Sequence, residues 1–356
     1  MEWKEDWAAA KEQLTDWWQG KGFVISVFAP REKPRENVPR PNPPASLEER
    51  WLDPGYRVQQ AEYEMSRTYY GGGAFPYFDT HIGPGNLATF IGSVPRFSPI
   101  TVWFEPCSWR LADDVPCTFT PDNYWFIRQR EILLHGVKKS SGRYLVGMPD
   151  LIENIDTLVS LYGVEEMLLG LVEHPEIIKR RLREINQIYA TVFDLFYEEI
   201  KDEDQGNAYC AFKIWGPGKT AKVQCDTAAM FSRDMFAEFV VPFLKEQCQA
   251  LDFSLFHLDG THCLVHLEEL LRIEELNAIE WTPRYGVEGG GDPVWYGLYR
   301  KILEGGKGVQ AIGVKPGEVI PLLNAVGTNG VFMLVNASSE QEAKELLHTV
   351  QRRFRR

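Results

Sequence analysis

The stretch FHLDGTHCLVHLEELLRIEELNAIEWTP, residues 256–283, contains the pattern that decides the fold. A β-type apolar run, Phe253–Leu258, comes before a helical pattern over Cys263–Leu271, and a second β-type run follows at Ala278–Trp281. Strand, helix and strand in this order are typical of a parallel βαβ unit. Polar side chains stand where both expected strands end, so this unit also predicts a place for chemistry.

The same alternation continues in both directions along the chain. Eight β-type runs alternate with helical patterns, and they are Phe75–Phe78, Thr101–Phe104, Tyr144–Met148, Ala208–Trp215, Phe253–Leu258, Ala278–Trp281, Gly308–Val314 and Val331–Val335. This order predicts an α/β fold, either a closed (β/α)8 TIM barrel or an open doubly wound sheet. No early strand is followed by GxGxxG, and GxxxxGK[ST] does not occur in the sequence. The pattern therefore favours the barrel over a nucleotide-binding sheet.

The first 54 residues have a different composition. Apolar residues at near-helical spacing over Trp3–Trp18 predict an amphipathic helix, and a short apolar run, Phe23–Phe28, follows. Six prolines between Pro30 and Pro44 then predict an extended arm. We therefore expect an N-terminal helix and proline-rich arm over residues 1–54 and the barrel over residues 55–356. Whether the arm covers the barrel or reaches a partner copy in a homodimer stays open.

Charge and composition exclude several functional classes. The chain has 38 Lys and Arg against 50 Asp and Glu, a formal net charge of −12, which opposes binding to nucleic acid and to anionic membranes. No apolar stretch is long enough to cross a bilayer, the N-terminus does not have the order of a signal peptide, and the six cysteines show no paired spacing. We expect a cytoplasmic protein with reduced thiols that acts on a small molecule.

Acidic and imidazole side chains gather where the expected strands end, which is where a (β/α)8 barrel carries its catalytic groups. His257 and Asp259 are two residues apart on one expected strand, so their side chains face the same side. Such a pair can act as a general base with its orienting acid, or as two metal ligands. Further strand-end residues of this kind are Asp79, His81, Glu105, Asp226 and Glu280.

Five segments resemble the uroporphyrinogen decarboxylase-like superfamily, and they are Tyr70–Gly85, Tyr144–Gly170, Cys225–Pro242, Phe256–Pro283 and Gly305–Pro316. The resemblance extends over roughly residues 55–350. It implies a (β/α)8 barrel with the active site at the carboxyl ends of the strands. The superfamily contains the tetrapyrrole decarboxylase and the zinc-dependent methyltransferases that move methyl groups to or from a corrinoid or a thiol.

The chain differs from both of these groups. The decarboxylase holds its substrate with an N-terminal loop of the form PxWxMRQAGR, which does not occur here. Thiol-type methyltransferases bind zinc through His-x-Cys and a second cysteine near the last strand. Here His257 matches the histidine, Asp259 stands in place of the first cysteine, and Asn336-Ala337 replaces the last-strand Gly-Cys. A site built from Glu105, Asp226, His257 and Asp259 would instead resemble the carboxylate-rich zinc sites of corrinoid-dependent O-demethylases.

The leading hypothesis is metal-assisted methyl transfer or O-demethylation of a small substrate, with a corrinoid protein as partner. A divalent metal such as zinc would polarise the ether or alcohol oxygen. Its expected ligands are Glu105, Asp226, His257 and Asp259. The expected catalytic residues are His257, Asp259, Glu105 and Glu280. The expected substrate-binding residues are Asp79, His81, Trp103, Lys213, Trp215 and Trp281.

Two other enzyme classes remain open. Aromatic faces beside paired carboxylates are typical of sugar sites, so Glu105 with Glu280 or Asp259 could act as acid and base on a carbohydrate-like substrate. A decarboxylase of a small carboxylic acid would need a buried cation, for which Lys213, Lys219 and Arg284 are the candidates.

Overall fold

Seven strands form one sheet in the order β2-β1-β13-β12-β11-β10-β9. The computed structural model describes residues 1–354, and within them these strands are β1 (Phe23–Pro30), β2 (Thr68–Gly72), β9 (Thr220–Gln224), β10 (Phe253–Asp259), β11 (Ala278–Thr282), β12 (Gly308–Val314) and β13 (Val331–Asn336). All neighbours from β1 to β9 in this order pair in parallel, and β2 pairs antiparallel with β1. The carboxyl ends of β9–β13 therefore meet at one edge, which we call the carboxyl edge.

A second sheet has the order β3-β6-β7-β8 and packs next to β9 through β7 and β8. Its strands are β3 (Tyr77–Phe78), β6 (Leu145–Met148), β7 (Asn207–Tyr209) and β8 (Ile214–Gly216). β3, β6 and β7 are parallel, whereas β8 returns antiparallel to β7. A separate antiparallel hairpin consists of β4 (Val94–Phe97) and β5 (Val102–Glu105).

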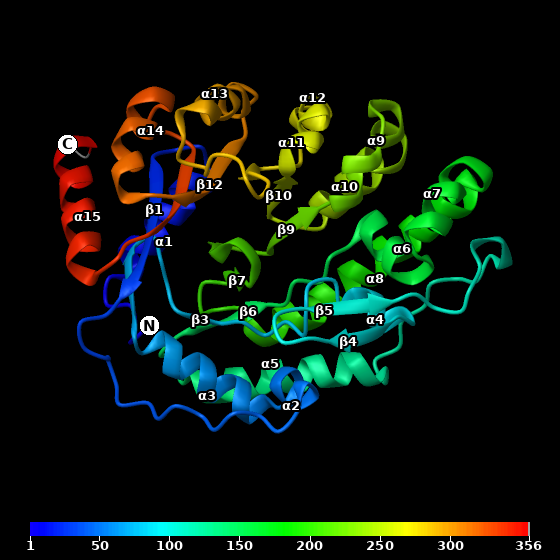
Figure 1. Cartoon of the computed structure of the whole chain (residues 1–356), viewed down its shortest axis with the longest axis horizontal. Helices are drawn as coiled ribbons and strands as arrows, with labels where there is room; N and C mark the ends of the chain where they lie inside the picture. The colour runs from blue at the N-terminus through cyan, green and yellow to red at the C-terminus, as the bar shows by residue number, and fades with distance from the viewer. Residues whose placement is uncertain (355–356) are drawn as a thin grey trace.

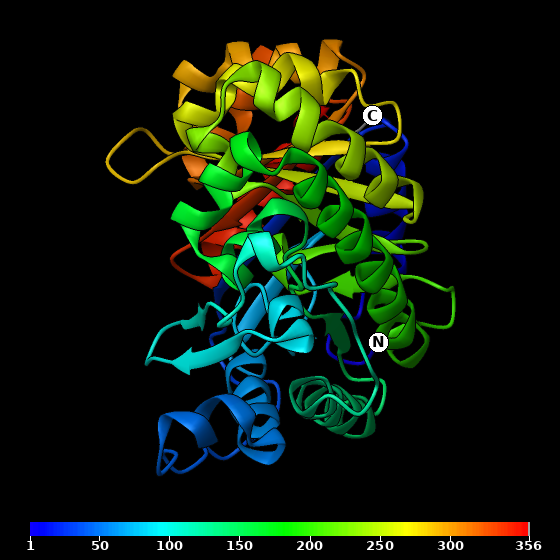
Figure 2. The ribbon, with the colours of Figure 1, turned by 90° about the vertical axis from the view of Figure 1, so that its right-hand side faces the viewer.

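Helices lie on the outer side of both sheets (Figures 1 and 2). They are α1 (Trp7–Trp18), α2 (Leu47–Leu52), α3 (Pro54–Met65), α4 (Leu87–Ile91), α5 (Tyr124–Ser140), α6 (Asn154–Tyr162), α7 (Val164–Glu173), α8 (Pro175–Ile200), α9 (Arg233–Phe239), α10 (Val241–Gln249), α11 (Gly260–Cys263), α12 (Leu267–Leu271), α13 (Tyr296–Glu304), α14 (Val319–Val326) and α15 (Glu340–Phe354). Pro175 begins α8 because proline fits the first turn of a helix. Among residues 1–354, no helix combines the length and the apolar character needed to cross a membrane.

The α/β class is confirmed, and so are the expected strands at β10, β11, β12 and β13. Two other expected strands differ. The run Thr101–Phe104 is half of the β4–β5 hairpin, outside both larger sheets. The run Ala208–Trp215 is broken into β7 and β8 by a short 3₁₀ turn, η2 (Ala211–Lys213). In that turn the φ angles of Phe212 and Lys213 are 57° and 52°, far outside the extended backbone of a regular strand.

Residues 1–54 do not form one separate arm. β1 pairs with β13 in the large sheet, and α1 packs against β1 and β8. The predicted boundary at residue 54 therefore cuts through a continuous sheet, and the longest stretch of residues 1–54 without helix or strand is 31–46. The physical reason lies in Phe23–Phe28, whose nearly unbroken apolar sequence is typical of a parallel strand covered on both faces.

Candidate functional site

Four polar side chains form a row across the large sheet. The strand register places Gln224 of β9 beside His257 of β10, His257 beside Glu280 of β11, and Glu280 beside Gln310 of β12. Paired residues of parallel strands share a face, so all four point to the same side. Gln224, Glu280 and Gln310 are 3%, 0% and 0% exposed. Buried polar groups are costly unless they are paired, so this row must be held by specific contacts.

The central contact of the row is between His257 and Glu280. Nδ1 of His257 lies 2.6 Å from Oε2 of Glu280. The other carboxylate oxygen, Oε1, accepts a hydrogen bond of 2.7 Å from the hydroxyl of Thr282. Glu280 therefore uses both oxygens inside the protein and orients the imidazole, whose Nε2 is left to face the carboxyl edge. This carboxylate–histidine arrangement is the one that supports metal-binding histidines.

The protonation of this pair follows from its surroundings. Burial lowers the pKa of His257, but the hydrogen bond and charge of Glu280, together with the charge of Asp226, outweigh burial and raise that pKa above its ordinary value. Burial raises the pKa of Glu280, and its contacts with His257 and Thr282 offset only part of the increase. A proton is thus retained between the imidazole and the buried carboxylate.

Asp226 and Asp259 approach the free side of the imidazole. Ligand atoms of Asp226, His257 and Asp259 all lie within 4.8 Å of one another. Nε2 of His257 is 4.0 Å from Oδ1 of Asp226, too far for a hydrogen bond. Zinc binds nitrogen and oxygen at about 2.0–2.2 Å, so an ion between these two atoms needs only a small side-chain adjustment. We call these three residues the open cluster.

Asp156, in the first turn of α6, positions Asp226. Its carboxylate accepts hydrogen bonds of 2.7 Å from the backbone N–H of Asp226 and 3.0 Å from that of Thr227. The hydroxyl of Thr227 donates to the same carboxylate over 2.5 Å. Burial and the charge of Asp156 raise the pKa of Asp226 to about 6, against the opposing charges of His257 and Lys222. The Asp226 carboxyl thus titrates just below neutral pH.

A second group of charges is buried beneath the row. Lys222 of β9 is fully buried, and its ammonium lies 2.7 Å from Oδ1 of Asp150 and also contacts Gln224. The carboxylate of Glu153 accepts a hydrogen bond of 2.8 Å from the backbone N–H of Gln224. Burial raises the pKa of Glu153 to about 8, although the charge of Lys222 opposes this. These contacts fix the end of β9 from which Asp226 extends.

The η2 turn covers the open cluster from one side. The ring centroid of Phe212 is 4.6 Å from that of His257. Nε2 of the buried Gln310 donates a hydrogen bond of 3.0 Å to the Phe212 carbonyl. Positive φ angles at two successive residues other than glycine cost free energy, and such conformations cluster at functional sites. The turn therefore belongs to the site.

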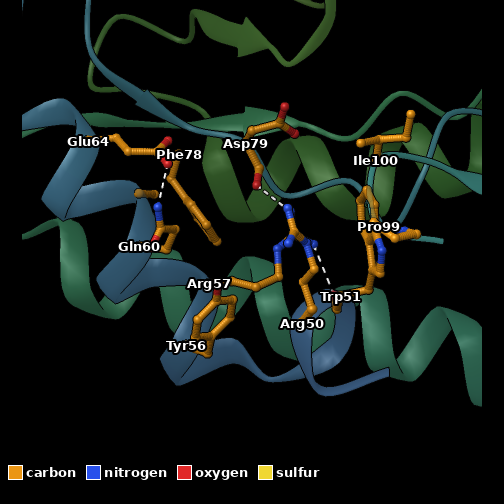
Figure 3. A pocket seen from close by; sticks show the side chains of 11 residues that line it. Arg50, Trp51, Tyr56, Arg57, Gln60, Glu64, Phe78, Asp79, Pro99 and Ile100 are labelled. Atoms are coloured by element: carbon orange, nitrogen blue, oxygen red, sulfur yellow. Dashed lines mark hydrogen bonds between the residues drawn. The ribbon is translucent and has the colours of Figure 1, made fainter. Parts of the chain in front are cut away.

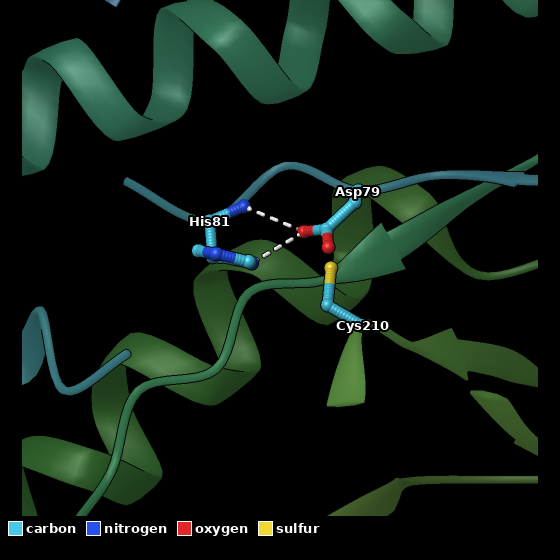
Figure 4. Close-up of side chains that lie close together, drawn as sticks. All are labelled: Asp79, His81 and Cys210. Carbon is cyan, nitrogen blue, oxygen red and sulfur yellow. Dashed lines mark hydrogen bonds and ion pairs between the residues drawn. The ribbon is translucent and has the colours of Figure 1, made fainter. Parts of the chain in front are cut away.

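Another cluster consists of Asp79, His81 and Cys210, whose ligand atoms also lie within 4.8 Å of one another. Figure 4 shows the Asp79 carboxylate between the His81 ring and the Cys210 sulfur. Oδ1 of Asp79 is 2.5 Å from Nδ1 of His81, and the backbone N–H of Thr80 donates to Sγ of Cys210 over 3.4 Å. Because its members already contact one another, we call these three residues the closed cluster.

Charge and burial stabilise the contacts within the closed cluster. Burial opposes ionisation of Asp79, but the His81 imidazole and the Arg57 guanidinium prevail and hold the pKa of Asp79 well below its usual range. Burial, and then the charge of Asp79, raise the pKa of Cys210 well above its usual value, so its thiol stays protonated. A cation at this position would have to displace a proton from sulfur and compete with Arg57.

Arg57 of α3 fixes the backbone of the closed cluster. Its guanidinium donates hydrogen bonds of 2.7 Å to the carbonyls of Asp79 and His81. It also lines a cavity of about 400 Å³ that Trp51, Phe78 and Ile100 help to form. Figure 3 shows the Asp79 carbonyl facing Arg57, with the carboxylate directed to the other side. None of the residues that line this cavity belongs to the open cluster.

Comparison with known proteins adds no further assignment: no family model matches the chain, and no curated protein matches it significantly. The site is therefore interpreted from its own geometry. Of the expected metal ligands, the structure brings together Asp226, His257 and Asp259.

Glu105 and Trp103 do not join them. Both lie on the β4–β5 hairpin, where the Glu105 carboxylate forms an ion pair with Arg96 across the two strands. Trp103 is 66% exposed. The prediction of Glu105 as ligand and catalytic acid assumed a strand of the main sheet, and the antiparallel hairpin removes that premise.

Trp215 and Trp281 are core residues rather than substrate-binding ones. Trp215 is 2% exposed, packs edge-on against Trp7 of α1, and donates to Asp202. Trp281 is fully buried against Trp295, because it points to the face of β11 opposite Glu280. The aromatic ring that does contact the open cluster is that of Phe212, which the sequence pattern did not single out.

Three further residues were not expected at the site. The helical spacing around Asp156 predicts a solvated charge, yet it is buried beside Asp226. Lys222 lies in β9, all of whose residues are buried, and a buried lysine must be paired. The role of Gln310 depends on its contact with the η2 turn, almost 100 residues away, and no local pattern indicates it.

Proposed function

We propose that this chain is a metal-dependent enzyme of the uroporphyrinogen decarboxylase-like superfamily, with its two sheets forming a (β/α)8 barrel. The observation that carries the proposal is the position of His257. One ring nitrogen contacts the buried Glu280, and the other faces Asp226 and Asp259 across a gap wider than a hydrogen bond. Three ligands with open positions are typical of a catalytic zinc site.

The reaction that we propose is transfer of a methyl group from a small methyl ether to a corrinoid carrier. When bound, a divalent metal supplies a Lewis acid that stabilises negative charge on the ether oxygen. The oxygen keeps the electron pair of the broken C–O bond and takes up a proton, and the methyl group passes to the reduced cobalt. The choice of methyl transfer rests on the family resemblance, and the metal site rests on the geometry.

Residues of the chain have distinct parts in this proposal. Glu280 holds the proton at Nδ1 of His257 and thereby keeps Nε2 free. It does not reach substrate, so it is a positioning residue rather than a catalytic acid. Asp156 holds Asp226 through backbone contacts. Phe212 covers one face of the imidazole and excludes water from it.

The metal site is tested by zinc binding to the full chain. We expect metal analysis to find one zinc per chain, and Asp259→Asn to weaken zinc binding about tenfold or more, since it removes an exposed ligand. Glu105→Gln is the matched control, because that acid lies on the hairpin. Equal zinc affinity in wild type and Asp259→Asn would contradict the proposal.

The reaction is tested with chemically reduced cobalamin and a panel of small methyl ethers. We expect the absorption spectrum of methylcobalamin to appear with wild type and zinc, and to be lost after chelation. No methyl transfer to cobalamin by a zinc-loaded protein would contradict the methyltransferase assignment and leave the metal site standing.

Decarboxylation of a small acid is the second candidate, and Lys213 is the observation that favours it. Lys213 is half-buried at the end of the η2 turn, whereas Lys219 pairs with Asp194 and Arg284 is exposed. Release of carbon dioxide from a carboxylate substrate, with no transfer of a methyl group, would support this candidate instead. The acid–base pair for a carbohydrate is not favoured, because Glu280 is fully buried and Glu105 lies on the hairpin.

A further inference from the structure

The cavity beside α2 and α3 is lined by two arginines, Arg50 and Arg57, that have no acidic partner. Exposed arginines elsewhere in this acidic chain pair with acids, as Arg96 does with Glu105. Within residues 1–354, no carboxylate lies within ion-pair distance of the guanidinium of Arg50 or of Arg57. Two cations that share a cavity without such a partner are available to an anionic ligand.

Backbone carbonyls hold Arg57 in place. Its guanidinium donates to four of them, at 2.7 Å for Asp79 and His81 and at 3.2 and 3.3 Å for Trp51 and Thr80. Carbonyl oxygens carry no net charge, so they fix the guanidinium without neutralising it. The Asp79 carboxylate, which could neutralise it, is directed away from the cavity and contacts His81.

The two arginines lie in the middle of the cavity. Figure 3 shows Tyr56 and Gln60 at one end, Pro99 and Ile100 at the other end, and the arginines between them. Glu64 lies at the first end, where its carboxylate accepts a hydrogen bond from the Gln60 amide. The centre of the cavity is therefore positive.

The second end of the cavity is apolar. The indole Nε1 of Trp51 donates a hydrogen bond of 2.8 Å to the Ser98 carbonyl, which ties α2 to the turn of the β4–β5 hairpin. Pro99 and Ile100 belong to that turn, and Ile100 is 89% exposed. An aromatic face beside aliphatic side chains suits a planar ring of a ligand better than a second charged group.

We propose that this cavity binds a nucleoside monophosphate, with its phosphate on Arg50 and Arg57 and its base against Trp51. A phosphate monoester carries almost two negative charges near neutral pH, which match two guanidinium groups, whereas a carboxylate carries only one. The cavity of about 400 Å³ has room for the sugar between phosphate and base. This binding site goes beyond the proposed reaction, because its lining residues are not those of the open cluster.

The test compares three probes by calorimetry on the full chain. The probes are adenosine 5′-monophosphate, adenosine, which lacks the phosphate, and ribose 5-phosphate, which lacks the base. We expect the nucleotide to bind about tenfold or more tightly than adenosine, because adenosine loses the charged hydrogen bonds to arginine. We also expect it to bind about tenfold or more tightly than ribose 5-phosphate, which loses the stacking of the base.

Variants assign each preference to one end of the ligand. Arg50→Gln should reduce the affinity for the nucleotide to nearly that for adenosine. Trp51→Leu should reduce it to nearly that for ribose 5-phosphate, and Trp51→Phe should keep most of the preference. Arg352→Gln is the matched control, because this exposed arginine of α15 does not line the cavity, and it should change neither preference.

The proposal is overturned if wild type does not bind the nucleotide at millimolar concentrations. It is also overturned if the nucleotide binds no more tightly than adenosine or than ribose 5-phosphate, or if Arg50→Gln keeps the preference over adenosine.

The same measurement in Asp259→Asn distinguishes this cavity from the open cluster. We expect unchanged affinity for the nucleotide, because Asp259 does not line the cavity. A loss of affinity in Asp259→Asn, with Arg50→Gln unaffected, would place the nucleotide at the open cluster and overturn the proposal. If zinc fails to bind wild type but the nucleotide preferences depend on Arg50 and Trp51, the metal site is wrong and the nucleotide site stands.

Discussion

The open and closed clusters contain similar side chains but differ in how these side chains meet. In the closed cluster, Asp79 lies 2.5 Å from His81, so the carboxylate and the imidazole are already partners. In the open cluster, 4.0 Å separate Nε2 of His257 from Asp226, and the imidazole is held from behind by Glu280. Ligand type alone therefore does not distinguish the two clusters, whereas the supported imidazole and its gap to Asp226 make the open cluster the better candidate for a metal site.

The strongest test of this difference removes one histidine from each cluster. His257→Ala should reduce zinc affinity by about 100-fold or more, because it removes the ligand that Glu280 supports. His81→Ala should leave zinc affinity unchanged. Competition with a chromophoric zinc chelator measures both affinities. A second zinc equivalent that disappears in His81→Ala or Cys210→Ser would break the comparison, because both clusters would then bind metal.

Removing the charge of Glu280, which supports the imidazole, should lower zinc affinity less than removing His257 itself. Glu280→Gln keeps the shape of the side chain but removes the charge that raises the pKa of His257. We expect zinc affinity to fall about 10- to 100-fold, and the pKa of His257, followed by NMR, to fall as well. Glu288→Gln, in the exposed loop after β11, is the control. An unchanged histidine pKa would show that Glu280 does not act through the imidazole.

The stability of the metal-free protein should rise in one variant of the open cluster. The pKa of Asp226 is about 6 in the folded chain, above its ordinary value, so its ionised form destabilises the fold. This cost is absent at low pH and appears as pH rises toward 6. Asp226→Asn should therefore stabilise the metal-free protein at pH 7 by about 1 kcal/mol, discounted because the carboxylate is half-exposed. Equal stability of both proteins in urea at pH 7 would contradict this expectation.

Ionisation of Asp226, which lowers the stability of the metal-free protein, should increase its affinity for zinc. The metal requires ionised Asp226 and an unprotonated Nε2 of His257, and both groups have raised pKa values. We therefore expect zinc affinity to increase as pH rises from 5 toward 8. In Asp226→Asn the increase should be less steep, because one titrating group is gone. A flat profile in wild type would argue against both residues as ligands.

In the closed cluster, the corresponding substitution of Asp79 should lower the stability of the protein, and this change should be the smallest of those expected here. The pKa of Asp79 is lowered in the folded chain, so its ionised form stabilises the fold at neutral pH, and that contribution is lost as pH falls through the lowered value. Asp79→Asn should destabilise the protein at pH 7 by about 1 kcal/mol or less, because the side chain is partly exposed. Thermal unfolding at pH 7 and pH 3 measures it, and the difference should shrink at the lower pH.

Parts of the site follow from the sequence because they depend on short-range geometry. The pairing of His257 with Asp259 follows from the period of two along a strand. Asp226 was expected at the site because it directly follows Val223-Gln224-Cys225. Glu280 was predicted as a catalytic residue, but its burial against His257 was not predicted, since a linear pattern does not tell which strand-end acid is buried. The prediction that Glu105 is a metal ligand and a catalytic residue failed because its strand forms a hairpin, although Ser98 and Pro99 are typical turn residues.

Other parts depend on contacts between distant segments. Asp156 binds backbone amides about 70 residues away, and no helical pattern encodes a partner of that kind. The η2 turn interrupts an apolar run whose local propensity favours a single strand, and Gln310 stabilises it from β12. The division at residue 54 failed for a similar reason, since both strands that pair with β1, β2 and β13, lie beyond that boundary.

That pairing of the first and last strands has a consequence for how the protein is made. Phe23 of β1 aligns with Val331 of β13, and Trp17 donates to the Gly330 carbonyl 313 residues further along. During synthesis, β1 can pair with β2 early, but its other edge stays unpaired until almost the entire polypeptide has been made, because β13 comes last among the strands. Contacts between residues so far apart in the sequence slow folding, and the partly folded intermediates expose apolar surface and are prone to aggregate. A chain that terminates before residue 331 should consequently aggregate or require a chaperone.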